Sequence, residues 1–421
     1  MRVLIIGAGL IGVTSAYALR RRGHEVVVID RAAGPGLETS FANGSLLTPS
    51  MPEPWNAPGC WRTLLASLGR SDSPMQLRAR ALPALTHWGL QFLRNSGAAR
   101  YQRNAIRNLR LALYSLKVMA SIRRDTGIEY GRTARGTLRL FREAAALDRA
   151  LAASPLASEE LKFRPLSKEQ TLELEPALTP IASQFVGSIH YPVDETGDAH
   201  RFCRGLAEQA RRGGVQFRFG MEILSIEADA GRVTAMVSAG ERLEAEKYLV
   251  AAASYSTPLL KGVGIDLPVQ PVKGYSVTFE HRPEADSLRI PIIDDDLHAV
   301  VVPLEGAIRV AGTAEFAGYD RSPNPTRTRN LLKLLQQVLP QFAFDPAAAK
   351  SWCGLRPMSS DGVPIIGPTP LSNLFVNTGH GHLGWTMAAG SAELLADLID
   401  GRQPALEPGS YDLKRFAKRF A

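Results

Sequence analysis

The sequence has 421 residues, of which 45% are hydrophobic and 21% charged, and its formal net charge is +8. This composition is typical of a soluble globular enzyme, and the length predicts two domains rather than one small core. The three cysteines form no C-x-x-C motif, so neither a disulfide framework nor a zinc site is indicated, which suits a reducing compartment. No apolar run reaches the roughly 18 residues of a membrane span, and the glycines inside the apolar N-terminus argue against a cleaved signal peptide.

The chain begins with a strand, a glycine-rich turn, a helix and a second strand. An apolar run at 3–6 predicts a strand buried on both faces. Residues 10–22 predict a helix that ends at Gly23, and residues 25–29 predict another buried strand. This order is that of the first half of a dinucleotide-binding unit.

Three glycines in G-x-G-x-x-G spacing join the first strand to the helix. Gly7 permits the tight turn, Gly9 lets the backbone approach a pyrophosphate, and Gly12 lets the helix and strand pack closely. The free N–H groups of the helix N-terminus favour phosphate binding. Asp30, at the end of the second strand, is placed to accept hydrogen bonds from ribose hydroxyls. The sequence therefore predicts a dinucleotide site here.

Residues 34–59 are rich in Gly, Ser, Asn and Pro and predict a long loop. Thr39, Ser40, Asn43 and Gly44 offer hydroxyl and backbone N–H groups to a second phosphate or a ribityl chain. A plain connecting loop is the alternative. A loop of this length after a dinucleotide unit favours the functional interpretation.

A basic region follows, and its apolar spacing predicts helix over residues 75–125. No acidic residue lies between Asp72 and Asp125. The cationic residues in this region are Arg78, Arg80, Arg94, Arg100, Arg103, Arg107, Arg110, Lys117, Arg123 and Arg124. A solvated helix face, an anionic membrane or acidic partner, and nucleic acid are the three interpretations; nucleic acid is the least favoured because no recognition motif accompanies the charge.

The middle of the chain alternates between strands and helices. A strand is predicted at 136–140 and a helix at 142–153. Ser167 begins the capping-box pattern S-K-E-Q, and Asp198 caps a helix over 199–212. Strands at 221–228, 232–238 and 244–252 then form a meander that returns to the first unit, as a two-part FAD domain requires.

From Gly274 the pattern changes to alternating strands, at 274–280, 299–305 and 307–318, which predict an antiparallel sheet in a separate domain. A helix is predicted at 323–339. The Gly- and Pro-rich residues 354–369 then precede a short strand at 374–377. A second glycine-rich turn opens a helix that ends at Gly401 and can bring another helix N-terminus to the cofactor.

These elements predict an α/β protein in which a Rossmann-like FAD-binding domain of the glutathione-reductase type is interleaved with an α+β substrate domain on an antiparallel sheet. The discontinuous FAD-binding domain is expected at 1–75, 180–256 and 340–421. The substrate-binding domain is expected at 76–179 and 257–339.

Five motifs together resemble the glycine-oxidase and D-amino-acid-dehydrogenase branch of the FAD-dependent amine oxidoreductases. They are GAGLIG from Gly7, ETSFANGSLLTPSMPEPW from Glu38, PVKGYS from Pro271, GLRPMSSDGVPIIG from Gly354 and GHGHLGWTMAAG from Gly379. The motifs span essentially the whole chain. The EPW loop, KGYS and GHG-x-LGW are most similar to the bacterial D-amino-acid dehydrogenases, and this resemblance implies a quinone or respiratory electron acceptor rather than oxygen.

The resemblance implies non-covalent FAD and a set of contacts to it. Some sarcosine oxidases of the superfamily attach FAD through a cysteine near the GLRP motif, but here Gly354 occupies that position and Cys353 lies one residue away. The implied contacts are Leu10, Ile11, Asp30, Arg31, Thr39, Ser40, Asn43, Gly44, Ser45, Leu46, Ile223, Ala252, Gly379, His380, Gly381, Leu383, Gly384, Trp385 and Thr386.

The resemblance also places a substrate-carboxylate-binding arginine at Arg356, where a guanidinium matches a carboxylate in a two-point fork. His382 stands where glycine oxidase has a second arginine and where the dehydrogenases usually have Thr, so it either shapes the pocket or fills space. Ala253 replaces the Gly of the family's A-G-A-W-S pattern. Tyr275 and His298, on predicted strands of the substrate domain, are candidates for the pocket wall.

The leading hypothesis is oxidation of a D-amino acid, or of a cyclic D-imino acid such as D-proline or hydroxy-D-proline, at Cα. Arg356 would anchor the carboxylate while hydride passes from Cα to flavin N5. The alternatives are an oxygen-using glycine or sarcosine oxidase and an RNA-binding or RNA-modifying flavoprotein. We expect a cytoplasmic protein, with the basic region at 75–124 available for the inner face of the membrane; the oligomeric state stays open.

Overall fold

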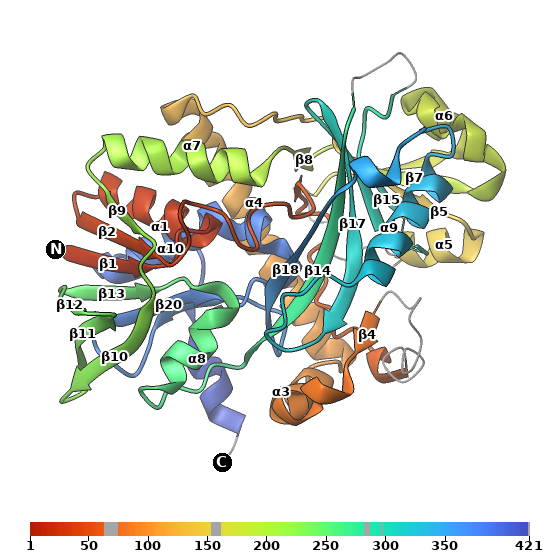
Figure 1. Ribbon diagram of the computed structural model, residues 1–421. Coiled ribbons are helices and arrows are strands. Elements are labelled where there is room, and N and C mark those ends of the chain that lie inside the picture. The colour runs from red at the N-terminus through yellow and green to blue at the C-terminus, as the bar shows by residue number, and fades with distance from the viewer. Residues whose placement is uncertain (63–74, 153–160, 282–286, 295, 298, 420–421) are drawn as a thin grey trace.

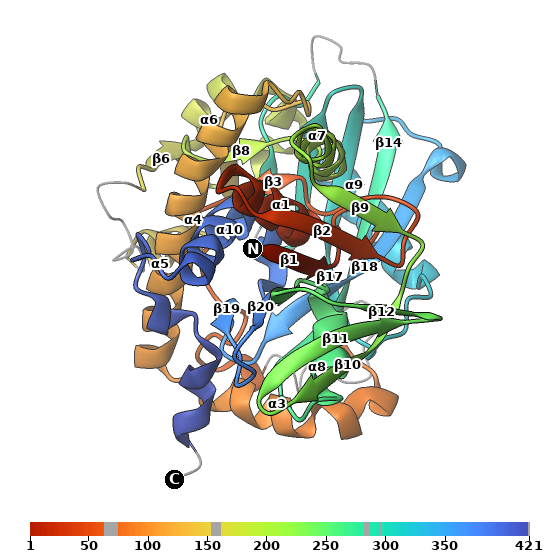
Figure 2. The same ribbon diagram turned by 90° about the vertical axis from the view of Figure 1, so that its left-hand side faces the viewer.

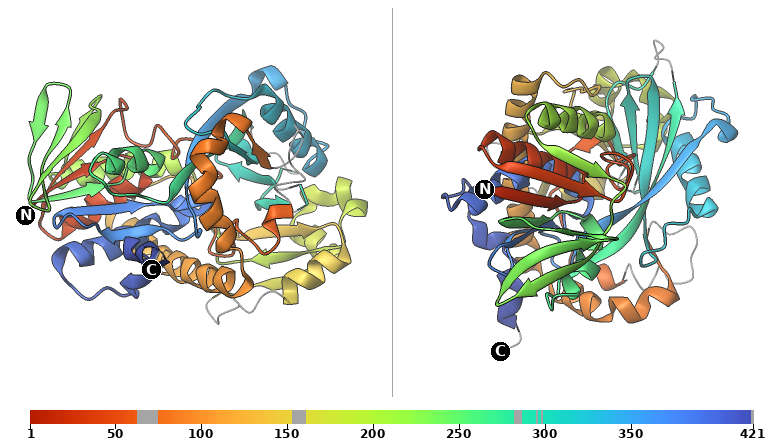
Figure 3. Two further views of the ribbon diagram at one scale, coloured as in Figure 1. Left: turned by 90° about the horizontal axis from the view of Figure 1, so that it is seen from below. Right: turned by 60° about the vertical axis from the view of Figure 1, so that its left-hand side comes forward.

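The computed structural model describes residues 1–62, 75–152, 161–281, 287–294, 296–297 and 299–419. Two large sheets divide the molecule (Figure 1). Figure 3 shows the sheet that contains the N-terminus on one side of the molecule and the larger sheet on the other.

The first sheet has six strands in the order β19-β20-β13-β1-β2-β9. All neighbouring pairs are parallel except β19 with β20. The strands are β1 (Arg2–Ile6), β2 (Glu25–Asp30), β9 (Gln216–Phe219), β13 (Lys247–Val250), β19 (Ile365–Pro368) and β20 (Leu374–Thr378). The predicted return of the meander to the first unit is confirmed, because β13 pairs with β1.

Both faces of this sheet are covered, as an apolar parallel sheet requires. Val3 and Ile5 of β1 pack among helices on one face, whereas Leu4 and Ile6 pack on the other against a small antiparallel sheet. The covering helices are α1 (Leu10–Arg21), α4 (Ala98–Thr126), α7 (Ala199–Arg212) and α10 (Gly384–Asp400). The opposite face carries β10 (Ile223–Asp229), β11 (Arg232–Ser238), β12 (Glu241–Leu243) and α8 (Ser256–Lys261), as Figure 2 shows.

The second sheet has nine strands, in the order β18-β14-β17-β16-β15-β5-β7-β6 with β4 beside β17. It is antiparallel except for the pairs β15–β5 and β17–β4. The strands are β4 (Met75–Leu77), β5 (Thr137–Phe141), β6 (Arg164–Ser167), β7 (Gly187–Tyr191), β14 (Val269–Glu280), β15 (Ile292–Asp294), β16 (Ala299–Leu304), β17 (Ala307–Phe316) and β18 (Lys350–Ser359). The expected antiparallel sheet is therefore present.

Short helices surround the second sheet. The helix α9 (Pro325–Val338) packs on β14, β16 and β17, and α3 (Leu82–Arg94) packs against Val272, Phe316 and Met358. The remaining elements are α5 (Ala144–Ala152), α6 (Lys168–Leu174) and a two-stranded ladder of β3 (Leu46–Leu47) with β8 (Glu195–Thr196).

Two predicted helix starts are confirmed in atomic detail. Ser167 forms the capping box with Gln170, and the Asp198 side chain accepts a hydrogen bond from the Arg201 N–H at the start of α7. These caps satisfy helix N–H groups that have no partner within the helix.

Two predicted elements differ from the structure, and one strand was not predicted. The basic region opens as strand β4, because Met75–Leu77 pair with β17, and its helix is interrupted at 95–97. Of the strand predicted at 244–252, only Lys247–Val250 form a strand (β13), and β12 already ends at Leu243. The Gly- and Pro-rich segment at 354–359, for which no element was predicted, is part of β18. This strand lies at the edge of the sheet, where a proline is tolerated.

The predicted domain boundaries stay a prediction, but the sheets divide the chain differently at two strands. Both β7 and β18 fall in ranges assigned to the FAD-binding domain and belong to the nine-stranded sheet. Among the described residues, every helix is too short or too polar to cross a lipid bilayer.

Candidate functional site

A cavity of about 800 Å³ lies between the two sheets. The glycine turn, the loop at 39–57, strands β14, β17 and β18, and the segment at 377–385 all contribute to its wall. The predicted site residues that line it are Gly9, Leu10, Ile11, Thr39, Ser40, Asn43, Gly44, Leu46, Tyr275, Arg356, His380, Gly381, His382, Gly384 and Trp385. Segments far apart in the sequence thus meet in one site.

The glycine turn has the close packing that its motif predicts. Gly7 has φ +107°, and a β-carbon there would lie 2.5 Å from the Ala251 carbonyl oxygen. A β-carbon on Gly12 would lie 1.8 Å from the Gly7 carbonyl oxygen. Gly9 caps α1 without a side-chain hydrogen bond, and Leu10 N–H donates to Ser40 Oγ at 3.1 Å. The turn is therefore shaped to let a ligand approach the helix N-terminus.

Asp30 and Arg31 lie beside this turn and not in the cavity wall. Asp30 accepts hydrogen bonds from Ala8 N–H at 2.6 Å and Ala32 N–H at 2.8 Å, while burial raises the pKa of its carboxyl. Arg31 Cζ lies 3.8 Å from the centre of the Tyr255 ring. Asp30 thus fixes the glycine turn, and its contact with a ribose stays a prediction.

The loop after β2 is hydrogen-bonded to the nine-stranded sheet. Thr39 Oγ1 donates to the Leu355 carbonyl at 2.9 Å, and Ser276 Oγ donates to the Ala42 carbonyl at 2.6 Å. Ser45 has φ +56°, a rare value for a residue other than Gly, and its hydroxyl accepts a hydrogen bond from Arg309 Nη1 at 2.7 Å. Ser45 itself points away from the cavity, whereas Asn43 and Gly44 line it.

The second glycine-rich turn presents polar atoms without partners to the cavity. His380 Nε2 lies 2.9 Å from Ser391 Oγ, but in the described part of the chain the buried atoms His380 Nδ1 and Trp385 Nε1 have no hydrogen-bond partner. Burial lowers the pKa of His380 to about 3, so its imidazole is neutral. A neutral ring nitrogen and an indole N–H that both lack partners indicate a polar ligand at this wall.

The remaining predicted cofactor contacts lie outside the cavity wall. Thr386 Oγ1 accepts a hydrogen bond from Thr48 N–H, and Ile223 opens strand β10. Ala252 does not line the cavity, but its neighbours Ala251 and Ala253 do. The other residues of this group are Gly7, Gly12, Gly379 and Leu383. Ala253 has φ +50°, the left-handed conformation that favours Gly, which explains the Gly of the related pattern.

Arg356 extends from β18 across Gly274 of the neighbouring strand β14. Its Nη1 donates to the Thr313 carbonyl at 3.0 Å, and its Cζ lies 5.5 Å from the centre of the Trp55 ring. The surrounding protein desolvates the guanidinium and lowers its pKa to about 10, which leaves it charged at neutral pH. Within the described part of the chain it has no carboxylate partner, so the cavity offers an uncompensated positive charge to an anion.

His382 also contacts Trp55. The two rings stack with their centres 5.4 Å apart. Burial, and to a lesser degree the charge of Arg356, lowers the pKa of His382 to about 4. A neutral His382 therefore adds an aromatic wall and no second positive charge.

Tyr275 lines the cavity with its ring, but its hydroxyl is already engaged. The phenol donates a hydrogen bond to Glu315, which also pairs with Arg78 at 2.6 Å and Lys273 at 3.3 Å. Burial, followed by the Glu315 charge, raises the pKa of Tyr275. His298, the other predicted wall residue, lies outside the described residues.

Several wall residues had no role assigned from the sequence, among them Trp55, Tyr101, Gly274 and Thr313. Trp55 and Gly274 belong to the EPW and KGYS motifs. Their contacts with Arg356 could not be predicted from the sequence, because they depend on the tertiary structure. Tyr101 reaches the cavity from α4. Thr313 has φ +57° and a buried hydroxyl that has no partner within the described ranges, and no sequence signal marks either property.

Cys353 does not face the cavity. Its Sγ donates to the Arg321 carbonyl at 3.2 Å and its side chain packs with the apolar cluster around α9, whereas Gly354 lines the cavity. This arrangement agrees with the expected non-covalent flavin. The glycine cradle and the unpartnered polar atoms also fit a flavin dinucleotide. Among the described residues, no group of histidines, cysteines and carboxylates could hold a metal ion.

Comparison with known proteins gives consistent relatives over the full chain. D-amino acid dehydrogenase from Paramagnetospirillum magneticum is 43% identical, with 99% of each chain covered. D-amino acid dehydrogenase from Chromohalobacter salexigens is 41% identical, with 99% of this chain and 100% of the relative covered. Among solved structures, glycine oxidase from Geobacillus kaustophilus is similar in fold, with a TM-score of 0.73, 22% identity and coverage of 98% and 99%.

The iminodiacetate oxidase of Chelativorans has the same fold, with a TM-score of 0.74, 22% identity and 98% of each chain covered. The family described as "FAD dependent oxidoreductase" (DAO) matches residues 2–398. This match includes both glycine-rich turns, Arg356 and His382. The chain therefore belongs to the family of FAD-dependent oxidoreductases.

Proposed function

We propose that the protein is an FAD-dependent D-amino-acid dehydrogenase that oxidises the CH–NH₂ or CH–NH group of a D-amino acid or a cyclic D-imino acid such as D-proline or hydroxy-D-proline. The observation that carries this proposal is the desolvated guanidinium of Arg356, which faces the cavity without a carboxylate partner in the described chain. Two relatives, 43% and 41% identical, are named D-amino acid dehydrogenase, which supports a D-amino acid as the class of substrate.

The chain offers FAD a continuous set of groups along the cavity. The turn at Gly9 and the α1 N-terminus take the pyrophosphate, the loop at Asn43–Gly44 takes the ribityl region, and His380 to Trp385 take the flavin ring. When bound, the flavin supplies the acceptor for the hydride removed from the substrate Cα.

The substrate is oriented by groups of both sheets. Arg356 takes the carboxylate through its fork of N–H donors, and Trp55 with His382 closes the adjacent wall. Because His380 and His382 are both neutral, neither adds a charge that would repel a protonated amine. The amine loses its proton to water before hydride leaves Cα.

A quinone or another respiratory carrier is the proposed electron acceptor, since the relatives near 40% identity are named dehydrogenases. The competing activity is that of an oxygen-using amine oxidase. Turnover of D-alanine or D-proline should proceed with a redox dye or a soluble quinone and yield little peroxide in air. Peroxide formation at the rate of substrate consumption, without an added acceptor, would favour the oxidase.

The surface of α3 and α4 supports peripheral association with an anionic membrane, at the cytoplasmic face. On α3, Leu82, Leu90 and Leu93 are 47%, 60% and 39% exposed. The exposed Arg94, Arg103 and Arg110 have no acidic partner within the described chain. This combination favours a lipid surface over the RNA alternative, because leucines can insert among acyl chains while arginines pair with anionic headgroups.

A further inference from the structure

The cavity wall that contains Trp55 lies at a contact between two loops. One is residues 52–56, which carry Trp55; the other is the turn at 359–362, which directly follows the strand of Arg356. Gly362 has φ +75°, and a β-carbon there would lie 2.4 Å from Pro54 Cβ. The two loops therefore touch one residue before Trp55.

Asn108 of α4 joins the backbones of these two loops. Its single side-chain NH₂ group donates to the Pro52 carbonyl and to the Gly362 carbonyl, each at 2.9 Å. Asn108 is 1% exposed, and its buried Oδ1 has no hydrogen-bond partner among the described residues. An unpaired buried acceptor is unfavourable. The favourable polar contacts of this side chain are therefore those of its two donor hydrogens.

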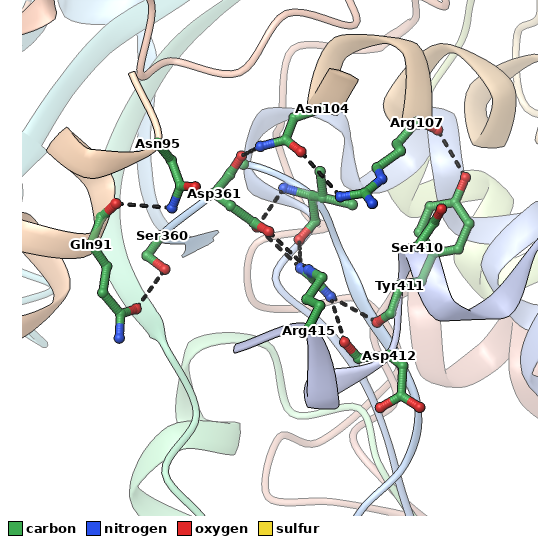
Figure 4. Close-up of polar contacts among 12 residues, drawn as sticks. Gln91, Asn95, Asn104, Arg107, Ser360, Asp361, Ser410, Tyr411, Asp412 and Arg415 are labelled. Carbon is green, nitrogen blue, oxygen red and sulfur yellow. Dashed lines mark hydrogen bonds and ion pairs between the residues drawn. The ribbon is translucent and has the colours of Figure 1, made fainter. Parts of the chain in front are cut away.

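Other side chains also hold the turn. Figure 4 shows Gln91, Asn104 and Arg415 among them, and Asn56 of the loop at 52–56 donates to the Ser360 carbonyl at 3.4 Å. Asn104, one helical turn before Asn108, donates to the Asp361 carbonyl at 3.0 Å. Arg415 pairs with the Asp361 carboxylate at 2.8 and 3.1 Å. The contacts of Asn104 and Arg415 hold the turn alone, whereas Asn108 also holds the loop of Trp55.

We propose that Asn108 is a positioning residue for the substrate carboxylate, because it sets the separation between Trp55 and Arg356. Trp55 lies 5.5 Å from the Arg356 Cζ and stacks on His382, so a displaced loop 52–56 changes the space beside the guanidinium. The inference rests on the proposed function and assigns the carboxylate end of that site.

The test compares Asn108→Ala with Asn104→Ala in the holoenzyme. Both replace a buried asparagine on one face of α4, but only Asn108 contacts the loop of Trp55. Asn108→Ala should raise KM for the D-amino acid by about tenfold, the equivalent of one lost hydrogen bond or slightly more, with FAD content and kcat close to wild type. Asn104→Ala should change KM by less than about twofold.

Asn108→Asp gives a second test, which applies even if Asn108→Ala folds poorly. A neutral aspartic acid keeps one O–H donor, whereas the ionised form sets a carboxylate against two carbonyl oxygens. The ratio of its KM to the wild-type KM should therefore increase with pH. A pH-independent ratio, or equal KM changes in Asn108→Ala and Asn104→Ala, would overturn the proposal.

Binding of benzoate, followed by the absorbance shift of the bound flavin, separates this inference from the proposed function. Benzoate carries the carboxylate and needs no turnover. Weaker benzoate binding in Asn108→Ala, with wild-type FAD content, supports the positioning role even if the amino-acid class is wrong. Wild-type benzoate affinity in that variant would contradict the role even if wild-type enzyme oxidises D-amino acids.

Discussion

The guanidinium of Arg356 lies directly over Gly274, where a β-carbon would come within 2.1 Å of the Arg356 Cζ. The two residues are on adjacent strands of the nine-stranded sheet, since β14 pairs Gly274 with Gly354 and Val272 with Arg356. The missing side chain at Gly274 therefore leaves room for the Arg356 guanidinium, whose Cζ lies 5.5 Å from the centre of the Trp55 ring.

Gly274→Ala should displace Arg356 while leaving the FAD site intact. A misplacement of about 1 Å lowers turnover by about 100-fold, and a comparable loss of kcat/KM is expected here. FAD content, read from the flavin absorbance, should stay at the wild-type level. Gly89→Ala on α3 is the control, because a β-carbon there meets no atom within 4 Å. Normal kcat/KM in Gly274→Ala would show that the arginine position is not critical.

Replacement of Arg356 should affect the substrate far more than the cofactor. A charge-assisted hydrogen bond of about 1.5–3 kcal/mol corresponds to a loss of about 10- to 100-fold in kcat/KM for Arg356→Met. Arg356→Lys keeps the charge without the two-point fork, so its kcat/KM should lie between those of wild type and Arg356→Met. Steady-state kinetics with D-alanine measures this order. Equal KM values for wild type and Arg356→Met would exclude carboxylate binding at Arg356.

The pH profile should contain no histidine ionisation from His382. Its pKa is lowered to about 4 by burial and by Arg356, so the ring loses its proton as pH rises through 4 and is neutral at higher pH. His382→Asn should therefore change KM without changing the shape of the kcat/KM profile between about pH 5.5 and 8.5. A wild-type inflection near the ordinary histidine pKa that this variant removes would be incompatible with a neutral His382.

Membrane association should depend on α3 and α4 together. A triple substitution to Gln at Arg94, Arg103 and Arg110 should weaken binding to vesicles of phosphatidylglycerol and phosphatidylcholine. The binding free energy should fall by roughly 1 kcal/mol per arginine. Cosedimentation measures the bound fraction at low and physiological salt.

The matched control replaces three arginines of α7, Arg204, Arg211 and Arg212, with Gln. This control should retain vesicle binding, since α7 carries none of the exposed leucines. Equal release of both triple variants would assign the binding to net charge alone. If the α3–α4 variant instead loses RNA and keeps vesicles, the nucleic-acid alternative is favoured.

The cofactor half of the site could be predicted from local sequence. Gly7, Gly9 and Gly12 must adopt a turn that few residues tolerate, and apolar strands on either side identify its context. The same reasoning found the caps of α6 and α7, because a cap depends on residues three positions apart.

The substrate half needed long-range information. The glycines and prolines of 354–359 have the composition of a loop, yet ladder pairing with β14 makes them an edge strand. Thr313 contributes its strained backbone carbonyl to Arg356, and Asn108 reaches two loops more than 50 and 250 residues away in the chain. No periodicity or spacing encodes such contacts.

Anaerobic titration of the bound flavin with paired D- and L-amino acids tests the central claim most directly. D-alanine or D-proline should bleach the oxidised flavin absorbance in wild type, the L-enantiomers should do so much more slowly, and Arg356→Met should respond to neither at the same concentrations. Flavin that is reduced equally by both enantiomers, or by none of the amino acids while dithionite reduces it fully, would contradict a D-amino-acid dehydrogenase built around Arg356.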